Sequence, residues 1–134
     1  MIDVESRVFS PIATALRTEF ANIFVASEAT NSPAKFPAVT IVEQDNSVLA
    51  RMRTLNIENA VTLMYEVNVF SNIYSGEKKL QAKKIIAVID REFSNMGFTR
   101  TMCSPMDNLQ DNTITRYVAR YEAVADKDFW IYQS

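Results

Sequence analysis

Residues 60–97 read AVTLMYEVNVFSNIYSGEKKLQAKKIIAVIDREFSNMG, and a change of hydrophobic period within this stretch decides the fold. The first half alternates apolar and polar residues, which predicts a long half-buried strand. In the second half, apolar residues recur at steps of three and four, which predicts an amphipathic helix from about Ser75 to Asn95, stopping at Gly97. The strand residues on one face are Val61, Leu63, Tyr65, Val67 and Val69, and the helix stripe is Ala82, Ile85, Ile86, Ile89, Phe93 and Met96. A strand followed by a helix of similar length predicts a two-layer unit.

The preceding segments add a helix and two strands to this unit. Val4, Val8, Ile12, Leu16 and Phe20 follow one another at steps of four, as on one face of a helix. Ser10-Pro11 leaves two alternatives: Ser10 caps a helix that begins at Pro11, or Pro11 kinks a longer helix that begins near Asp3. We favour a helix over at least 10–20. Short strands are predicted at 22–26 and 38–43, followed by a turn at 44–47.

The segments that follow predict an antiparallel hairpin. Its strands are 98–103 and 113–124, joined by a loop at 106–111, and Cys103 is expected to be a small buried residue. Together these elements predict an α+β fold, a two-layer sandwich with a mainly antiparallel sheet and two helices packed on one face. At 134 residues, we expect 1–134 to be a single domain.

The composition argues against several classes of protein. The chain contains no histidine, so it has no Ser-His-Asp or Cys-His arrangement and no imidazole metal ligand. A single cysteine excludes an internal disulfide, and a net charge of -2 argues against nucleic-acid binding driven by charge. No apolar run is long enough to cross a bilayer, and no basic segment followed by an apolar one opens the chain, so we expect no membrane span and a cytosolic site of synthesis.

The sequence indicates no catalytic, cofactor or metal site. Glu43, Glu66 and Asp90 are scattered along the chain, and nothing in the sequence brings two carboxylates together. The Asp- and Asn-rich loop at 106–111 lacks the central glycine and final glutamate of an EF-hand. Lysines of the predicted helix lie off its apolar stripe, and a solvated face explains them better than a phosphate site. We therefore expect a protein that is not an enzyme and needs no cofactor.

Two segments follow neither period and are candidate subunit interfaces. Residues 48–59 form an irregular excursion between two strands, and the chain closes with bulky residues at 129–132, which either dock as a short final strand or anchor on another subunit. The candidate interface residues are Leu49, Arg51, Met52, Arg53, Leu55, Ile57, Phe129, Trp130 and Tyr132.

The order helix, strand, strand, excursion, long strand, helix, hairpin resembles the tail-terminator (tail completion) proteins of long-tailed bacteriophages. Similar phrases recur along nearly the whole chain: IATALRTEF, KFPAVTIVEQDN, MYEVNVFSN before the lysine-rich helix, GFTRT after it, and TRYVARYEAVADKDFWIY. None of these phrases is a catalytic signature, so the resemblance rests on their order and spacing.

The resemblance implies a structural protein of a phage or prophage. Such proteins form a homo-oligomeric ring, typically a hexamer, that caps the head-proximal end of the tail tube, ends tube growth and offers a surface for head-tail joining. The implied partners are other copies of the chain, the tail tube protein and the head connector or completion protein, while DNA passes through the ring without being read. The implied location is the virion tail, with the host cytoplasm during assembly.

Two alternatives remain open at this point. One is a neighbouring head-tail connector or head-closure protein, which shares a small α+β architecture. The other is a small ligand-binding domain or an enzyme that uses carboxylates or lysine. A pocket with convergent ionisable groups of strongly perturbed pKa would favour the latter.

Overall fold

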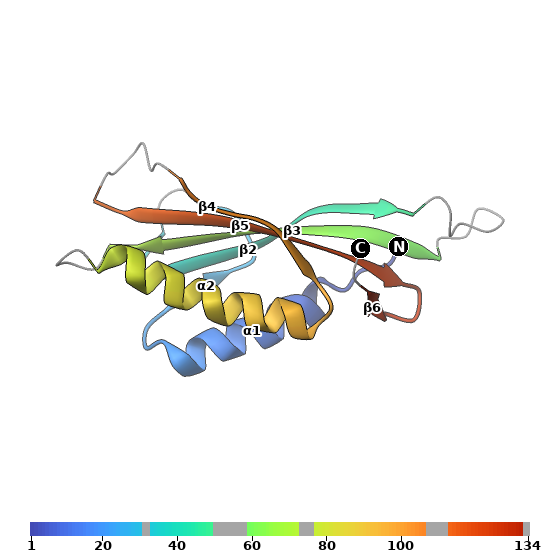
Figure 1. Cartoon of the computed structure of the whole chain (residues 1–134). Helices are drawn as coiled ribbons and strands as arrows, with labels where there is room; N and C mark the ends of the chain where they lie inside the picture. The colour runs from blue at the N-terminus through green and yellow to red at the C-terminus, as the bar shows by residue number, and fades with distance from the viewer. Residues whose placement is uncertain (31–32, 50–58, 73–76, 107–112, 133–134) are drawn as a thin grey trace.

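Two helices pack on one face of a six-stranded, mainly antiparallel sheet, so the protein is a two-layer α+β structure (Figure 1). The structure is a computed structural model that describes residues 1–30, 33–49, 59–72, 77–106 and 113–132. The elements in chain order are α1 (Glu5–Glu19), β1 (Phe24–Ala26), β2 (Ala38–Val48), β3 (Ala60–Ser71), α2 (Lys78–Asn95), β4 (Thr99–Met106), β5 (Thr115–Asp126) and β6 (Ile131–Tyr132).

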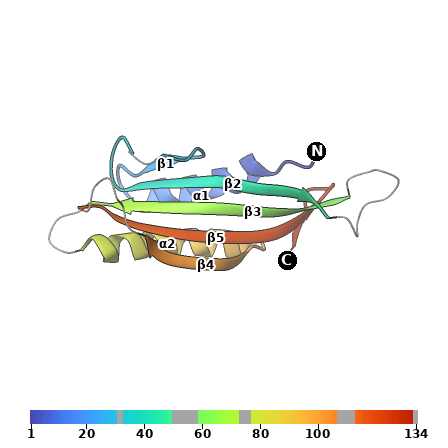
Figure 2. The ribbon, with the colours of Figure 1, turned by 90° about the horizontal axis from the view of Figure 1, so that it is seen from above.

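The strands lie in the order β1-β2-β3-β5-β4, and β6 pairs with β5 (Figure 2). Only β1 and β2 run parallel, while every other pair is antiparallel. The predicted long strand is confirmed as β3, which occupies the centre of the sheet and pairs with β5 from Ala60↔Asp126 to Ser71↔Thr115. The change of period in residues 60–97 therefore marks the central strand and the helix that covers it.

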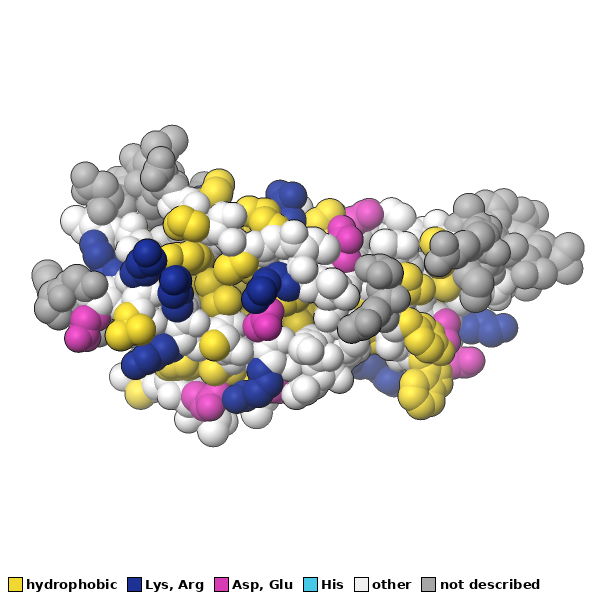
Figure 3. Space-filling model, in the orientation of Figure 1, with side chains coloured by type: hydrophobic (Ala, Val, Ile, Leu, Met, Phe, Trp, Pro, Cys, Tyr) yellow, Lys and Arg dark blue, Asp and Glu magenta, His cyan; other side chains and the backbone are white. Residues whose placement is uncertain are grey.

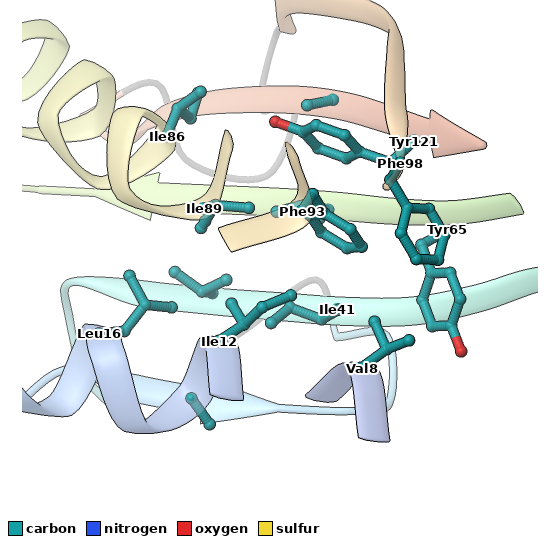
Figure 4. Packing of buried hydrophobic residues seen from close by; sticks show 14 of the residues in the cluster. Val8, Ile12, Leu16, Ile41, Tyr65, Ile86, Ile89, Phe93, Phe98 and Tyr121 are labelled. Carbon is teal, nitrogen blue, oxygen red and sulfur yellow. The ribbon is translucent and has the colours of Figure 1, made fainter. Parts of the chain in front are cut away.

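The apolar face predicted for β3 is confirmed, because all five of its residues are buried beneath the helices. The α1 stripe supplies Val8, Ile12 and Leu16, and the α2 stripe supplies Ile86 and Ile89 (Figure 4). Burying a side chain of this size contributes about 1.5–3 kcal/mol, so these faces hold the two layers together.

Four aromatic rings form the centre of this core. Phe93 of α2 stacks on Tyr121 of β5, with centroids 4.2 Å apart and the planes at 10°. Phe98 meets Phe93 edge to face at 5.0 Å and Tyr65 at 5.6 Å (Figure 4). Offset stacked and edge-to-face contacts are the favourable geometries of aromatic pairs, so α2 is fixed to β3 and β5 at its C-terminal end.

The start of α1 decides between the two alternatives that Ser10-Pro11 leaves open. The helix begins at Glu5 rather than at Pro11, so it covers the predicted segment up to Glu19 and contains Pro11. Val4 and Val8 are both fully buried, so packing of the first turns against the sheet outweighs the loss of one backbone hydrogen bond at proline. The alternative of a longer helix containing Pro11 was the correct one.

The turn predicted at 44–47 is wrong. These residues continue β2, and the register shifts between Glu43 and Asp45 as one extra residue enters the strand. A β-bulge absorbs such a residue without ending the ladder, so polar residues with turn propensity remain paired with β3 up to Val48↔Val61.

The other boundaries differ by a few residues. The second helix begins at Lys78 with Glu77 as its N-cap, while Ser75 lies outside the described residues. The hairpin strands extend further than predicted, to Met106 in β4 and Asp126 in β5. The predicted hairpin pairing is confirmed, and the loop residues 107–112 lie outside the described ranges.

The expectation that Cys103 is buried is wrong. Its thiol is exposed, because β4 is an edge strand of which most residues face solvent. Cys103 pairs with the core residue Ala119 and so shares the helix-covered face, but at this edge of the sheet that face does not bury it.

Candidate functional site

The turn between β5 and β6 is organised around the carboxylate of Asp126. This carboxylate accepts hydrogen bonds from the backbone N–H groups of Asp128 at 2.9 Å and Trp130 at 3.0 Å, and from the Tyr132 hydroxyl at 3.0 Å. Desolvation raises the pKa of Asp126, but the three hydrogen bonds favour the charged form and lower the pKa overall. One ionised side chain thus fixes the shape of the C-terminal turn.

Three aromatic side chains project from this turn. Trp130 is 67% exposed, Tyr132 51% and Phe129 40%. The Arg7 guanidinium lies 4.7 Å from the centroid of the Phe129 ring, while Ile131 packs toward Gly97 at the end of α2. Apolar side chains gather at this end of the molecule beside charged ones (Figure 3). The prediction of a short final strand is confirmed, yet Trp130 itself is left on the surface.

The described residues on either side of the predicted excursion, Leu49 and Asn59, lie near the same turn. Leu49 donates its N–H to the carbonyl of Ala60 at 2.9 Å, and Lys127 donates its N–H to the carbonyl of Asn59 at 3.1 Å. Ala60 pairs with Asp126, so the fold brings Leu49 to the end of the sheet where the turn with Phe129, Trp130 and Tyr132 follows β5. Figure 1 shows that β2 ends on the side of the sheet where β5 turns into β6. The other candidates of the excursion lie outside the described residues: Arg51, Met52, Arg53, Leu55 and Ile57.

The lysines of α2 lie along its outer face. Lys79, Lys83 and Lys84 are exposed, and the Lys78 ammonium donates to the carbonyl of Thr113 at 2.8 Å, which joins α2 to the start of β5. This side of the molecule also carries acidic groups between the basic ones (Figure 3). The arrangement agrees with the prediction of a solvated helix face.

Sequence reasoning missed a cluster of three carboxylates. Asp3, Glu5 and Glu43 each place one carboxylate oxygen within 4.8 Å of the other two. Burial, a hydrogen bond with Glu5 and the charges of Glu5 and Asp3 together raise the pKa of Glu43 to about 7, while a hydrogen bond with the Asn46 amide opposes the increase. The signal was present in β2, because the alternation Val39, Ile41, Glu43 puts this glutamate on the core side.

Another carboxylate, that of Asp90 in α2, has partners that the sequence does not predict. It accepts a hydrogen bond from the buried Tyr121 hydroxyl at 3.0 Å and pairs with Arg100 at 3.1 Å. The charge of Asp90 and this hydrogen bond add to burial in raising the pKa of Tyr121. Asp90 therefore fixes the position of the Tyr121 ring, which is a structural role.

No protein-family model and no curated protein matches this chain. Neither helix of the described ranges has the length and hydropathy needed to cross a bilayer.

Proposed function

We propose that this protein is a tail terminator of a long-tailed phage or prophage. In this role, copies of the chain form a ring on the head-proximal end of the tail tube, which ends tube growth and provides the surface for head-tail joining. The partners are the tail tube protein and the head connector, and DNA passes through the ring without specific contacts. The proposal starts from the order of elements and phrases described above.

The observation that supports it most is the gathering of candidate contact residues at one end of the sheet. Trp130 and Tyr132 are exposed at the end of the sheet where Leu49 also lies, although they come from distant parts of the chain. Large aromatic residues are the side chains that most often dominate binding between subunits. A surface confined to one end suits a head-to-tail contact, which closes into a ring when its rotation permits.

The edges of the sheet offer a second kind of contact. Among the described residues, β1 pairs only with Ala38, Val39 and Thr40, so the rest of β2 has no strand beside it on that side. The outer side of β4 is the opposite edge of the sheet. Edge strands present backbone donors and acceptors that a neighbouring subunit can pair with.

The oligomeric state of the purified chain tests the proposal directly. Size-exclusion chromatography with light scattering, followed by negative-stain electron microscopy, is expected to show rings. Deletion of the gene from its phage or prophage is expected to give overlong tails without heads. Normal, joined virions after deletion would refute the proposal, whatever the oligomeric state in solution.

Position in the particle separates the tail terminator from a head-closure protein. A tag on the chain in intact particles should lie at the top of the tail tube. A tag that remains with tail-less heads would favour the connector role instead.

The carboxylate cluster favours a ligand-binding domain as a second candidate. Asp3 and Glu5 line a pocket of about 380 Å³ together with Ser6, Phe9, Ser10 and Ser27. A carboxyl group with a pKa near neutral pH, such as Glu43, is a common feature of functional sites. If deletion of the gene leaves tail length and head joining normal, the result favours the ligand-binding role and contradicts the tail-terminator role.

A further inference from the structure

Within the described ranges, three buried side-chain polar atoms have no hydrogen-bond partner, and two of them belong to neighbouring residues. These two are the hydroxyl of Tyr65 and the Oε1 atom of Glu43, and the third is Oγ1 of Thr40. Tyr65 and Glu43 are directly paired across β3 and β2, so their side chains extend on the same face of the sheet. Leaving a buried polar atom without a partner costs about 1–3 kcal/mol, so a pair of them needs an explanation.

The Tyr65 hydroxyl is directed toward the carboxylate cluster. Its side chain is fully buried, with 0% of its surface exposed, and the hydroxyl points away from Phe93 and Phe98, past Val8 and toward α1 (Figure 4). Burial raises the pKa of this hydroxyl, and the charges that raise it further are those of Glu43, Glu5 and Asp3, in that order. The unpartnered hydroxyl thus points to the side of the core that holds Glu43, its partner across the strands, and the start of α1.

The carboxylates come from two separate elements. Glu5 is the first residue of α1, Asp3 lies just before the helix and accepts a hydrogen bond on Oδ1 from the Glu5 N–H at 3.0 Å, and Glu43 comes from β2. The positive end of the helix dipole favours acidic groups at this position. A proton shared between Glu5 and Glu43 relieves part of their repulsion, but neither effect gives a partner to Tyr65 or to Oε1 of Glu43.

We infer that Asp3, Glu5, Glu43 and the Tyr65 hydroxyl form a Ca²⁺ site that links the start of α1 to β2. Ca²⁺ prefers carboxylate and neutral oxygen ligands, and ligands on opposite sides of the ion lie about 4.8 Å apart at its usual bond lengths. The carboxylate oxygens here lie within 4.8 Å of one another, so they fit one such shell. Mg²⁺ demands a near-ideal octahedron, whereas the more flexible shell of Ca²⁺ suits carboxylates that come from two separate parts of the chain.

The adjoining pocket supplies the rest of the coordination shell. Three ligand carboxylates and one hydroxyl leave several of the six to eight positions around Ca²⁺ for water. The pocket contains Asp3 and Glu5 and is lined by the serines Ser6, Ser10 and Ser27, which can hold such waters by hydrogen bonds. The site lies within one chain and does not depend on the ring proposed above.

Calorimetric titration of Ca²⁺ into the chelator-treated full chain tests the site. We expect one ion per chain, with a Kd of about 10⁻⁵ to 10⁻³ M for a site of this charge and openness. Tb³⁺ used as a probe should bind at the same place and show luminescence excited through the adjacent tyrosine. Amide exchange of residues 3–8 should slow when Ca²⁺ is added.

Three variants separate a cation site from a proton-sharing pair. Glu43→Gln is expected to weaken Ca²⁺ at least about tenfold, because a charged ligand is lost. Tyr65→Phe keeps the ring and removes only the hydroxyl, so it should weaken Ca²⁺ by about threefold to tenfold and reduce Tb³⁺ luminescence. Glu122→Gln makes the same change of charge in β5 and should alter the affinity less than about twofold. If Glu43→Gln does not fold by circular dichroism, Glu5→Gln takes its place.

The inference is overturned if no saturable binding of Ca²⁺ occurs up to about 10 mM, well above the range of known protein sites. It is also overturned if Glu122→Gln weakens Ca²⁺ as much as Glu43→Gln does, or if Mg²⁺ binds more tightly than Ca²⁺. These results are independent of tail length or ring formation, so the site and the proposed function can fail separately.

Discussion

At the scale of single residues, Glu43 makes stability depend on pH. Its pKa rises from 4.5 to about 7 in the folded protein, so the native state keeps a proton that the unfolded chain releases between these values. The stabilisation is therefore fully present below about pH 4.5 and is lost as the pH rises to about 7. Because the carboxyl is partly exposed and screened by solvent, we expect a loss on the order of 1 kcal/mol.

Urea denaturation of Glu43→Gln in chelator at several pH values tests this expectation. The variant cannot titrate at residue 43, so its free energy of unfolding should fall less than that of the parent chain between pH 4.5 and 7. Glu122→Gln should follow the parent. Parallel curves for the parent and Glu43→Gln would show that Glu43 titrates alike in both states.

Two of the buried core tyrosines, Tyr65 and Tyr121, provide a second test at this scale. Tyr121 donates its hydroxyl proton to Asp90, whereas the Tyr65 hydroxyl has no partner in the part of the chain that the structure describes. Tyr121→Phe should therefore lower the free energy of unfolding by about 1 kcal/mol, while Tyr65→Phe in chelator should change it by less than about 0.5 kcal/mol or raise it. Urea denaturation measures both, and equal losses would contradict the assignment of partners.

At the scale of elements, Pro11 is the feature of α1 that helix chemistry alone would not place there. It is the seventh residue of the helix, is exposed and has no N–H to offer to the carbonyl of Arg7. We expect Pro11→Ala to raise the free energy of unfolding by about 1–2 kcal/mol, because the helix gains a hydrogen bond. The greater freedom of the unfolded chain without proline offsets part of this gain. Thermal and urea denaturation provide the measurement.

Thr14→Ala is the matched control for Pro11→Ala. It lies on the same helix, is also exposed, and reports the gain from helix propensity alone, about 0.5 kcal/mol. If Pro11→Ala stabilises no more than this control, or destabilises the protein, the proline is not a cost to the helix.

The elements also show which parts of the fold could be predicted from sequence. Long periodic segments gave β3, α2 and the α1 stripe correctly, because one buried face dictates their pattern. The predicted end of β2 was wrong, since pairing with β3 and a bulge after Glu43 outweigh the local turn propensity of residues 44–47. The prediction that Cys103 is buried was wrong, because the sequence of a short strand does not show that the strand lies at the edge of the sheet.

The carboxylate cluster shows a different limit of sequence analysis. Glu43 and Glu5 lie far apart in the chain and meet only because α1 packs across β2. The alternation in β2 predicts which face Glu43 shares, but not which residues of α1 lie opposite it. Such partners depend on how the two layers align, and no local pattern carries that information.

At the scale of the whole molecule, the long sheet has one end where exposed aromatic residues gather. β6 ties this end together, since its pairing with Val124 and Ala125 and the Asp126 hydrogen bonds hold the turn in place. A truncation after Asp128 would remove this strand and disturb the fold, so it would confuse stability with assembly. Replacing only the side chain of Trp130 avoids this problem, because 67% of it is exposed.

We therefore expect Trp130→Ala to weaken assembly more than it weakens the monomer. Loss of a central interface tryptophan costs about 2 kcal/mol or more, while truncating an exposed side chain changes the free energy of unfolding by about 0.5 kcal/mol or less. Light scattering over a range of concentrations measures the first effect, and urea denaturation measures the second. Leu80→Ala is the control, because Leu80 is a similarly exposed apolar residue on α2, and it should leave assembly unchanged. If Trp130→Ala assembles like the parent chain, subunits meet through another surface, and the strand edges of β2 and β4 become the next residues to change.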